Sequence, residues 1–156
     1  MEDIIVTAIY CDDIRSETGG KLSYMGAYNS DLVVPQFPAQ LAKLCIQVTV
    51  RLPKDTRAQD MTIKVANESE TMAEVPFPNG SLQTMLATAL DASKDFAKTT
   101  TFTCSLSVQF GNLQIEKPSV ISLSAVVDGV EIRGNSLRIR LPTEAELRQA
   151  TVPAFS

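Results

Sequence analysis

The chain has 156 residues, of which 44% are hydrophobic and 21% are charged. These proportions exclude a disordered or fibrous protein, and the length suits one domain that buries roughly 70% of its unfolded surface. The net charge of −4 argues against nucleic acid as the main partner, because phosphate contacts need clustered lysine and arginine side chains.

Catalytic and cofactor chemistry has little support in the sequence. Histidine is absent, which removes Ser-His-Asp and Cys-His catalysis and the usual zinc sites. No glycine-rich phosphate-binding motif is present. Cys11, Cys45 and Cys104 are widely spaced and lie in or beside apolar strand patterns, which is typical of reduced, buried thiols in a cytoplasmic protein. We therefore expect a protein that is not an enzyme, with no cofactor and no metal.

Targeting signals are also missing. The N-terminus lacks the basic region and cleavage site of a signal peptide. No apolar run approaches the roughly 20 residues that span a bilayer. The sequence thus predicts synthesis in the cytoplasm and no membrane partner.

The first predicted elements surround a charged loop. Residues 4–10 are apolar and β-branched, which indicates a strand covered on both faces. A second strand over residues 22–28 is expected to run antiparallel to it. The connecting loop is longer than a tight hairpin turn. We predict a structural site in this region, made of Asp12, Asp13, Arg15, Glu17, Gly19, Gly20 and Lys21.

The charged residues of this loop suggest two roles. Its three carboxylates are the type of ligand that Ca²⁺ prefers, but Arg15 and Lys21 lie among them and no second acidic loop completes the ligand set. Local ion pairing and turn capping is the favoured role. Arg15 is expected to pair with Asp12, Asp13 or Glu17.

Further strands follow along the chain. Residues 32–34 form a short strand that Pro35 and Pro38 keep from a central position. The clearest alternation of apolar and polar residues runs over 44–52. A change of apolar phase at Gly111 predicts a bulge or a bend between sheets, and Asp128-Gly129 is a hairpin signal. The remaining strands are expected over 61–65, 71–75, 102–110, 121–127, 130–132 and 137–141.

Two helices interrupt or follow the strands. Apolar residues recur at helical spacing over 82–96, with Ser81 as the expected N-cap, and this helix should lie across a sheet edge or the end of the fold. Thr143 and Glu146 fit the capping-box pattern and predict a short helix to Ala150.

Eight to ten short strands with regular turn signals predict an all-β fold. The preferred architecture is an antiparallel β-sandwich with one short inserted helix and a short C-terminal helix, and a partly closed barrel is the alternative. Residues 1–142 form the sandwich domain, and residues 143–156 form a C-terminal helix and tail.

The N-terminal third carries a recognisable set of motifs, namely Thr7-Ala-Ile-Tyr-Cys-Asp-Asp-Ile-Arg15, Glu17, Gly20-Lys-Leu-Ser23 and Gly26-Ala-Tyr28. In these motifs it resembles a family of small bacterial and phage-encoded proteins of unknown function. Phe37-Pro38 and Leu44-Cys-Ile46 are also similar, whereas residues 82–96 depart from the family pattern. The resemblance implies a β fold and a bacterial or phage source, and it carries no activity.

These observations favour a non-enzymatic structural or interaction protein. The first hypothesis is a phage virion component, such as a capsid-decorating or minor structural protein, made in the host cytoplasm. Its partners would be copies of itself, as a homo-oligomer, or other phage structural proteins. The alternative is a cytosolic bacterial or prophage binding module that regulates or inhibits a host protein.

The apolar C-terminal tail is the predicted partner interface. Val152, Pro153 and Phe155 offer apolar surface without strand rhythm or charge, whereas a free tail is usually polar. Two placements remain open, one on the chain's own domain and one on a neighbouring subunit.

Overall fold

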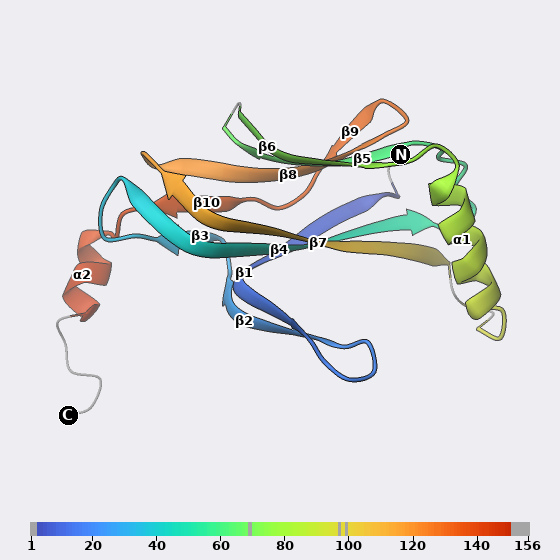
Figure 1. The fold of residues 1–156 in the computed structure, drawn as a ribbon, viewed down its shortest axis with the longest axis horizontal. Helices are drawn as coiled ribbons and strands as arrows, with labels where there is room; N and C mark the ends of the chain where they lie inside the picture. Colours follow the sequence, from blue (N-terminus) through green and yellow to red (C-terminus); the bar gives the residue numbers. More distant parts are fainter. Residues whose placement is uncertain (1–2, 69, 97, 99, 151–156) are drawn as a thin grey trace.

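The structure is a computed structural model that describes residues 3–68, 70–96, 98 and 100–150. These residues form ten strands and two helices, and the strands make two layers of β-sheet (Figure 1). The predicted all-β sandwich is therefore confirmed. The elements are β1 (Ile5–Ser16), β2 (Leu22–Tyr28), β3 (Asp31–Val33), β4 (Ala39–Pro53), β5 (Met61–Asn67), β6 (Glu70–Phe77), α1 (Ser81–Ala92), β7 (Thr101–Ile115), β8 (Ser119–Val127), β9 (Val130–Arg133), β10 (Leu137–Arg140) and α2 (Glu144–Ala150).

The first sheet has the order β2-β1-β4-β7, and all its neighbours are antiparallel. Its two longest strands, β4 and β7, pair from Ala39↔Ile115 to Pro53↔Thr101 in one register. Strand β4 begins five residues before the expected start because residues 39–43 also pair with β7.

The second sheet has the order β3-β10-β8-β5-β6, with β9 beside β8. The prediction of a purely antiparallel sandwich needs one correction here, since β3 runs parallel to β10 through pairs such as Ile139↔Leu32. Strand β3 lies at the sheet edge, as the prolines that follow it predict.

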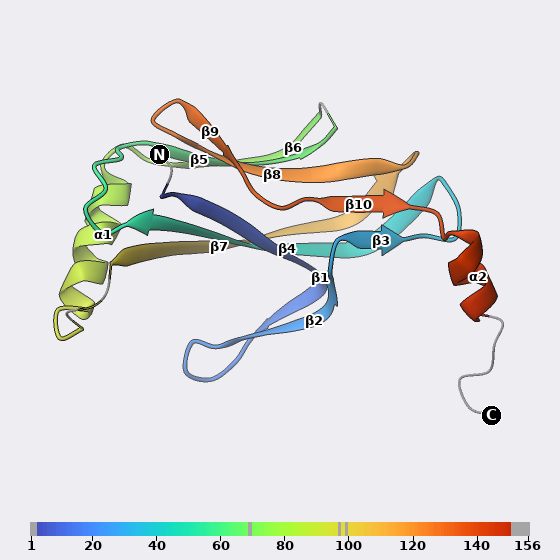
Figure 2. The ribbon, with the colours of Figure 1, turned by 180° about the vertical axis from the view of Figure 1, so that it is seen from behind.

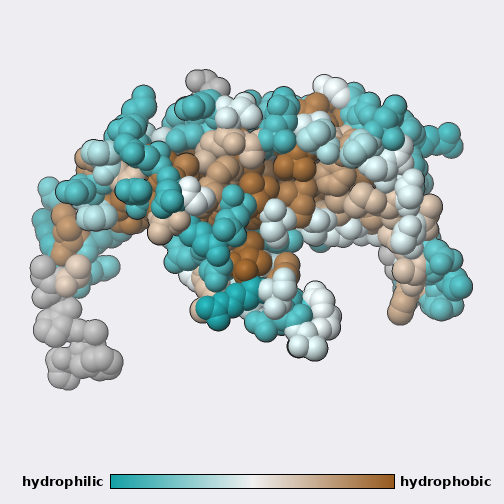
Figure 3. Space-filling view, in the orientation of Figure 1, coloured by the Kyte–Doolittle hydropathy of each residue, from teal (hydrophilic) through white to brown (hydrophobic). Residues whose placement is uncertain are grey.

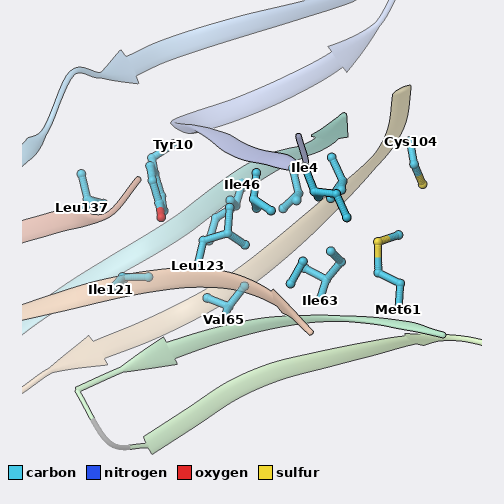
Figure 4. Close-up of a cluster of buried hydrophobic side chains, with 14 of the residues drawn as sticks. Ile4, Tyr10, Ile46, Met61, Ile63, Val65, Cys104, Ile121, Leu123 and Leu137 are labelled. Atoms are coloured by element: carbon cyan, nitrogen blue, oxygen red, sulfur yellow. The ribbon is translucent and has the colours of Figure 1, made fainter. Parts of the chain in front are cut away.

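Apolar residues from the facing sides of the two sheets form one core (Figure 4). Alternate residues of β4, such as Ile46 and Val48, meet Ile63 and Leu123 of the other sheet. Each is exposed by 1% or less, so the alternating pattern identified the buried face of β4 correctly. The exposure of the outer face of β1 was not predicted. Cover on both faces was expected for this strand, but Ile9 is 39% exposed.

Asn135 links the two sheets at the open side of β1. Its side-chain Oδ1 accepts a hydrogen bond from the Ala8 amide at 2.7 Å, and its Nδ2 donates to the Ala8 carbonyl at 2.9 Å. The Tyr10 hydroxyl donates to the Asn135 carbonyl at 2.8 Å. Both backbone groups of Ala8 therefore point away from β4, on the stretch of β1 that β2 does not reach.

Helix α1 covers one end of the sandwich and α2 lies at the other (Figures 1 and 2). Leu82 and Leu86 of α1 are buried in the core. The helix ends at Ala92 rather than at residue 96, and the predicted N-cap is wrong. Gly80 occupies that position in a left-handed conformation, and the Ser81 hydroxyl donates to the Pro78 carbonyl at 2.6 Å instead.

The apolar residues of β7 change from even to odd positions, but the strand has no bulge there. The β4–β7 register is the same on both sides of Gly111, and β7 stays within one sheet. Asn112 has a φ of 51°, which indicates a local bend. On β4, opposite this bend, the buried side also changes. Leu44 and Ala39 are both buried although one has an even and the other an odd number.

No helix in the described ranges combines the length and the apolar character needed to cross a membrane.

Candidate functional site

The predicted loop is the end of a β-hairpin arm. Strand β1 continues to Ser16 and pairs with β2 through Ile14↔Tyr24 and Arg15↔Ser23. The expectation that Asp12, Asp13 and Arg15 lie in a loop was therefore wrong, because backbone pairing with β2 extends the strand past them. Residues 12–27, called the arm below, project from the body of the sandwich in both ribbon views (Figures 1 and 2).

Asp12 holds the base of the arm on the core-facing side. The Tyr28 hydroxyl donates a hydrogen bond to Asp12 Oδ1. Burial first, and then this carboxylate, raise the pKa of Tyr28 above its usual range. Gly26 lies against the same carboxylate with a φ of 64°. The base of the arm is thus shaped by a carboxylate, a phenol and a glycine from two paired strands.

Asp13 holds the base on the opposite side. Lys43 of β4 donates to Asp13 Oδ1, and the more exposed Arg15 lies 3.4 Å from Oδ2. Lys43 first, and then Arg15, hold the pKa of the Asp13 carboxyl below its usual value, and Asp13 raises the pKa of Lys43. Arg15 thus has one of its expected partners, whereas Lys43 was not predicted because it lies thirty residues along the chain.

The turn of the arm uses the remaining predicted residues. The Glu17 amide donates to the Lys21 carbonyl at 2.8 Å, and the Ser23 hydroxyl donates to Glu17 Oε1 at 2.9 Å. Gly19 and Gly20 have φ values of 82° and 74°, a region that glycine occupies without the strain other residues meet. These contacts support the predicted capping and turn role.

One face of the arm is apolar and lies outside the core. Ile14, Leu22 and Tyr24 share the face that continues from Tyr10 and Tyr28. Leu22 is 38% exposed and Tyr24 is 36% exposed, and neither belongs to the core cluster. Met25, on the other face, is 47% exposed. Figure 3 shows apolar surface reaching the place where the arm meets the sandwich.

The cysteines are free and buried, as expected. Cys11 lies directly opposite Cys45 on β1 and β4, a pairing that their sequence separation did not suggest. Burial first, and then the neighbouring Cys45, raise the pKa of the Cys11 thiol. A raised pKa lowers the thiolate fraction, and Cys11 is buried, so these surroundings do not activate the thiol.

No other surface in the described part of the chain offers clear catalytic chemistry. No group of three or more Cys, Asp or Glu side chains is placed there to hold a metal ion. The outer face of the second sheet is hollowed around Ser122 and Ser124, but the charges beside it pair with one another, as in Lys64–Glu74 at 3.5 Å and Arg133–Glu131 at 3.8 Å.

The C-terminal helix is tied to the second sheet by an ion-pair network. Asp31 accepts from Arg138 at 2.6 Å and from Arg140 at 2.8 Å, and Arg140 also donates to Glu146 at 2.8 Å. The predicted capping box is present, since the Glu146 amide donates to Thr143 Oγ1 at 3.3 Å and the Thr143 amide donates to Glu146 Oε1 at 3.4 Å. The predicted interface residues Val152, Pro153 and Phe155 lie outside the described residues.

Comparison with known proteins gives one positive finding. No curated protein matches the sequence. The model of a family of unknown function, DUF6941, matches residues 6–140. This range contains the arm, helix α1 and both sheets apart from Ile5. The chain therefore belongs to the DUF6941 family of unknown function.

Proposed function

We propose that this chain is a non-enzymatic interaction protein that binds a protein partner through the apolar face of the arm. The observation that carries the proposal is the continuation of the core face onto Ile14, Leu22 and Tyr24, where the second sheet, as far as the structure describes the chain, does not cover it. An apolar sheet face is stable in water when another layer covers it. A partner's apolar side chains would supply that layer.

The base of the arm suits it for binding. Asp13 is paired with Lys43 of β4, and Asp12 with Tyr28 on the neighbouring strand. These contacts fix the direction in which the arm leaves the sandwich. A pre-formed arm loses less conformational entropy on association than a flexible loop would.

The more specific proposal is a structural component of a phage virion. A small sandwich with a projecting arm suits a repetitive assembly, in which each copy places its arm on a neighbour. The protein would be made in the host cytoplasm and then enter the particle. The resemblance of the N-terminal third to small bacterial and phage-encoded proteins supports this origin.

The experiment uses virions purified from a phage that encodes the chain. Mass spectrometry should find the wild-type chain at a stoichiometric level. The double variant Leu22→Ser, Tyr24→Ser should fold and yet be lost from the particles. Val130→Ser is the matched control, because Val130 is 46% exposed on the distant β8–β9 hairpin and its loss should not affect incorporation. Equal incorporation of the arm variant and the control would contradict the role of the arm.

The alternative is a cytosolic binding module that regulates or inhibits a host protein. It predicts virions without the chain and one host protein that co-purifies with it. The arm variant should then lose that protein while Val130→Ser retains it. Gene neighbourhood separates the two proposals, since capsid and tail genes favour the first and host metabolic or defence genes favour the second.

A further inference from the structure

Strand β7 has a long free edge. It is the last strand of the first sheet, and within the described ranges no strand pairs with its outer side. The Asn135 bonds turn both backbone groups of Ala8 away from β4. Along an antiparallel strand, the amides and carbonyls of successive residues point alternately to its two sides. Followed from Ala8 across β4 to β7, the register places the amides and carbonyls of Ser105 and Ser107 on the side of β7 that faces away from β4, toward solvent. The edge therefore presents a row of unpaired donors and acceptors.

The strands at the edges of the second sheet carry features that block strand addition. Strand β6 contains Glu70, Glu74 and Pro76, and its pairing with β5 has a register shift. Strands β3 and β9 are three and four residues long. Charge, proline, irregularity and short length are the usual protections of sheet edges. Strand β7 has no charge and no proline over its 15 residues, and its one irregularity, at Asn112, lies near its C-terminal end. It lies in the longest uncharged run of the sequence.

The core is also incompletely covered at this edge. Leu106, Val108 and Phe110 face inward but are only partly buried. Their neighbours Ile46 and Val48, one strand further in, are exposed by 1% or less. A strand added beside β7 would cover these apolar side chains as well as the backbone groups.

We infer that the occupant of the β7 edge is a second copy of this chain, paired antiparallel through β7 about a two-fold axis. The chain carries a net charge of −4, so two copies repel each other except where they meet on uncharged surface. Antiparallel self-pairing of β7 places serine, threonine and glutamine side chains opposite one another and brings no like charges together. A two-fold axis also closes the assembly at two copies.

This pairing joins the first sheets of both copies into one continuous sheet. Strand β2 is at the opposite edge from β7, so the two arms lie at the far ends of that sheet. The inference does not depend on the proposed role of the arm, because the two surfaces are separate.

The experiment measures the mass of the full chain by light scattering across a range of concentrations. The wild type should have twice the monomer mass of 16.9 kDa. Ser105→Lys with Gln109→Lys places charges on the β7 edge and should weaken dimerisation at least tenfold. Thr84→Lys with Thr88→Lys adds the same charge to exposed positions of α1 and is the matched control. A monomeric wild type, or a Lys variant at Ser105 and Gln109 that dimerises like the control, would overturn the inference.

A charge-swap pair tests direct contact. Ser105→Glu with Gln109→Glu should also be monomeric alone, and mixing it with the corresponding Lys variant should restore a dimer. If these variants fail to fold, hydrogen exchange on the wild type decides instead. The amides of Ser105 and Ser107 should exchange more slowly as concentration rises, whereas concentration-independent exchange would contradict the dimer. Slow exchange of these amides that appears only when a different protein is added would assign the edge to that partner and reject self-association.

Discussion

Gly26 lies directly against the carboxylate of Asp12 at the base of the arm. A Cβ atom on Gly26 would come within 2.2 Å of Asp12 Oδ2 and 2.8 Å of Cγ. The φ of Gly26 is 64°, which side chains disfavour. Two independent constraints therefore act on one position, and the close approach involves the carboxylate that accepts the hydrogen bond from Tyr28.

Gly26→Ala should destabilise the chain by more than the cost of a left-handed backbone alone. That cost is about 1–2 kcal/mol per residue, and displacement of Asp12 adds to it. Gly19→Ala is the matched control, since Gly19 has a φ of 82° but no atom near the position of an added Cβ. Urea denaturation measures both free energies of unfolding. Equal losses in the two variants would show that the Asp12 contact is unimportant.

Much of the fold could be predicted from alternation along single strands. The apolar residues of β4 from Leu44 to Leu52 are buried as the pattern indicates, and the capping box of α2 needs only Thr143 and Glu146. These signals are local, so they survive in any arrangement of the sheets. The limits of β1 were missed because pairing with β2, and not local composition, keeps Asp12 and Asp13 in a strand.

The features that depend on strand order could not be read from the sequence. Lys43 meets Asp13 only because the arm leaves the sheet beside β4. Cys11 meets Cys45 through the register of β1 on β4. The uncharged run over β7 was visible, but its meaning depends on that strand being at an edge. Sheet topology therefore determines the candidate interfaces.

Lys43→Ala should destabilise the arm more than Arg15→Ala. Lys43 joins β4 to Asp13, whereas Arg15 is two residues from Asp13 on the same strand and its side chain is 65% exposed. Exposed local ion pairs contribute little, so Arg15→Ala should leave Tm unchanged. Calorimetry on both variants checks the order. A lower Tm for Arg15→Ala than for Lys43→Ala would contradict it.

Stability should fall in acid through Asp31. Arg140 and then Arg138 hold the pKa of the Asp31 carboxyl below its usual value, which is about 3.9 in an unfolded chain. Near that pH the unfolded state binds more protons than the folded state. The stabilisation that Asp31 contributes is therefore complete above about pH 5, and it is lost as pH falls through the pKa of the folded state. Asp31→Asn should therefore show a flatter acid profile of the urea midpoint. Asp55→Asn, at an exposed aspartate outside this network, should retain the wild-type profile.

Stability should also fall in alkali through Tyr10. Tyr10 is 1% exposed, and burial raises its pKa to about 12, against about 10 in an unfolded chain. Between these values the folded state keeps a proton that the unfolded state releases. The free energy of unfolding should thus decrease by up to about 1.4 kcal/mol per pH unit for this one group.

Tyr10→Phe tests this assignment. The variant loses the hydrogen bond from the Tyr10 hydroxyl to the Asn135 carbonyl, so it should be less stable than wild type at pH 8. Its stability should nevertheless decline less steeply above pH 10, because the buried phenol is gone. Urea midpoints at several alkaline pH values, together with tyrosinate absorbance of the folded protein, give both results. Parallel alkaline slopes for the two proteins would show that folding does not suppress the ionisation of Tyr10.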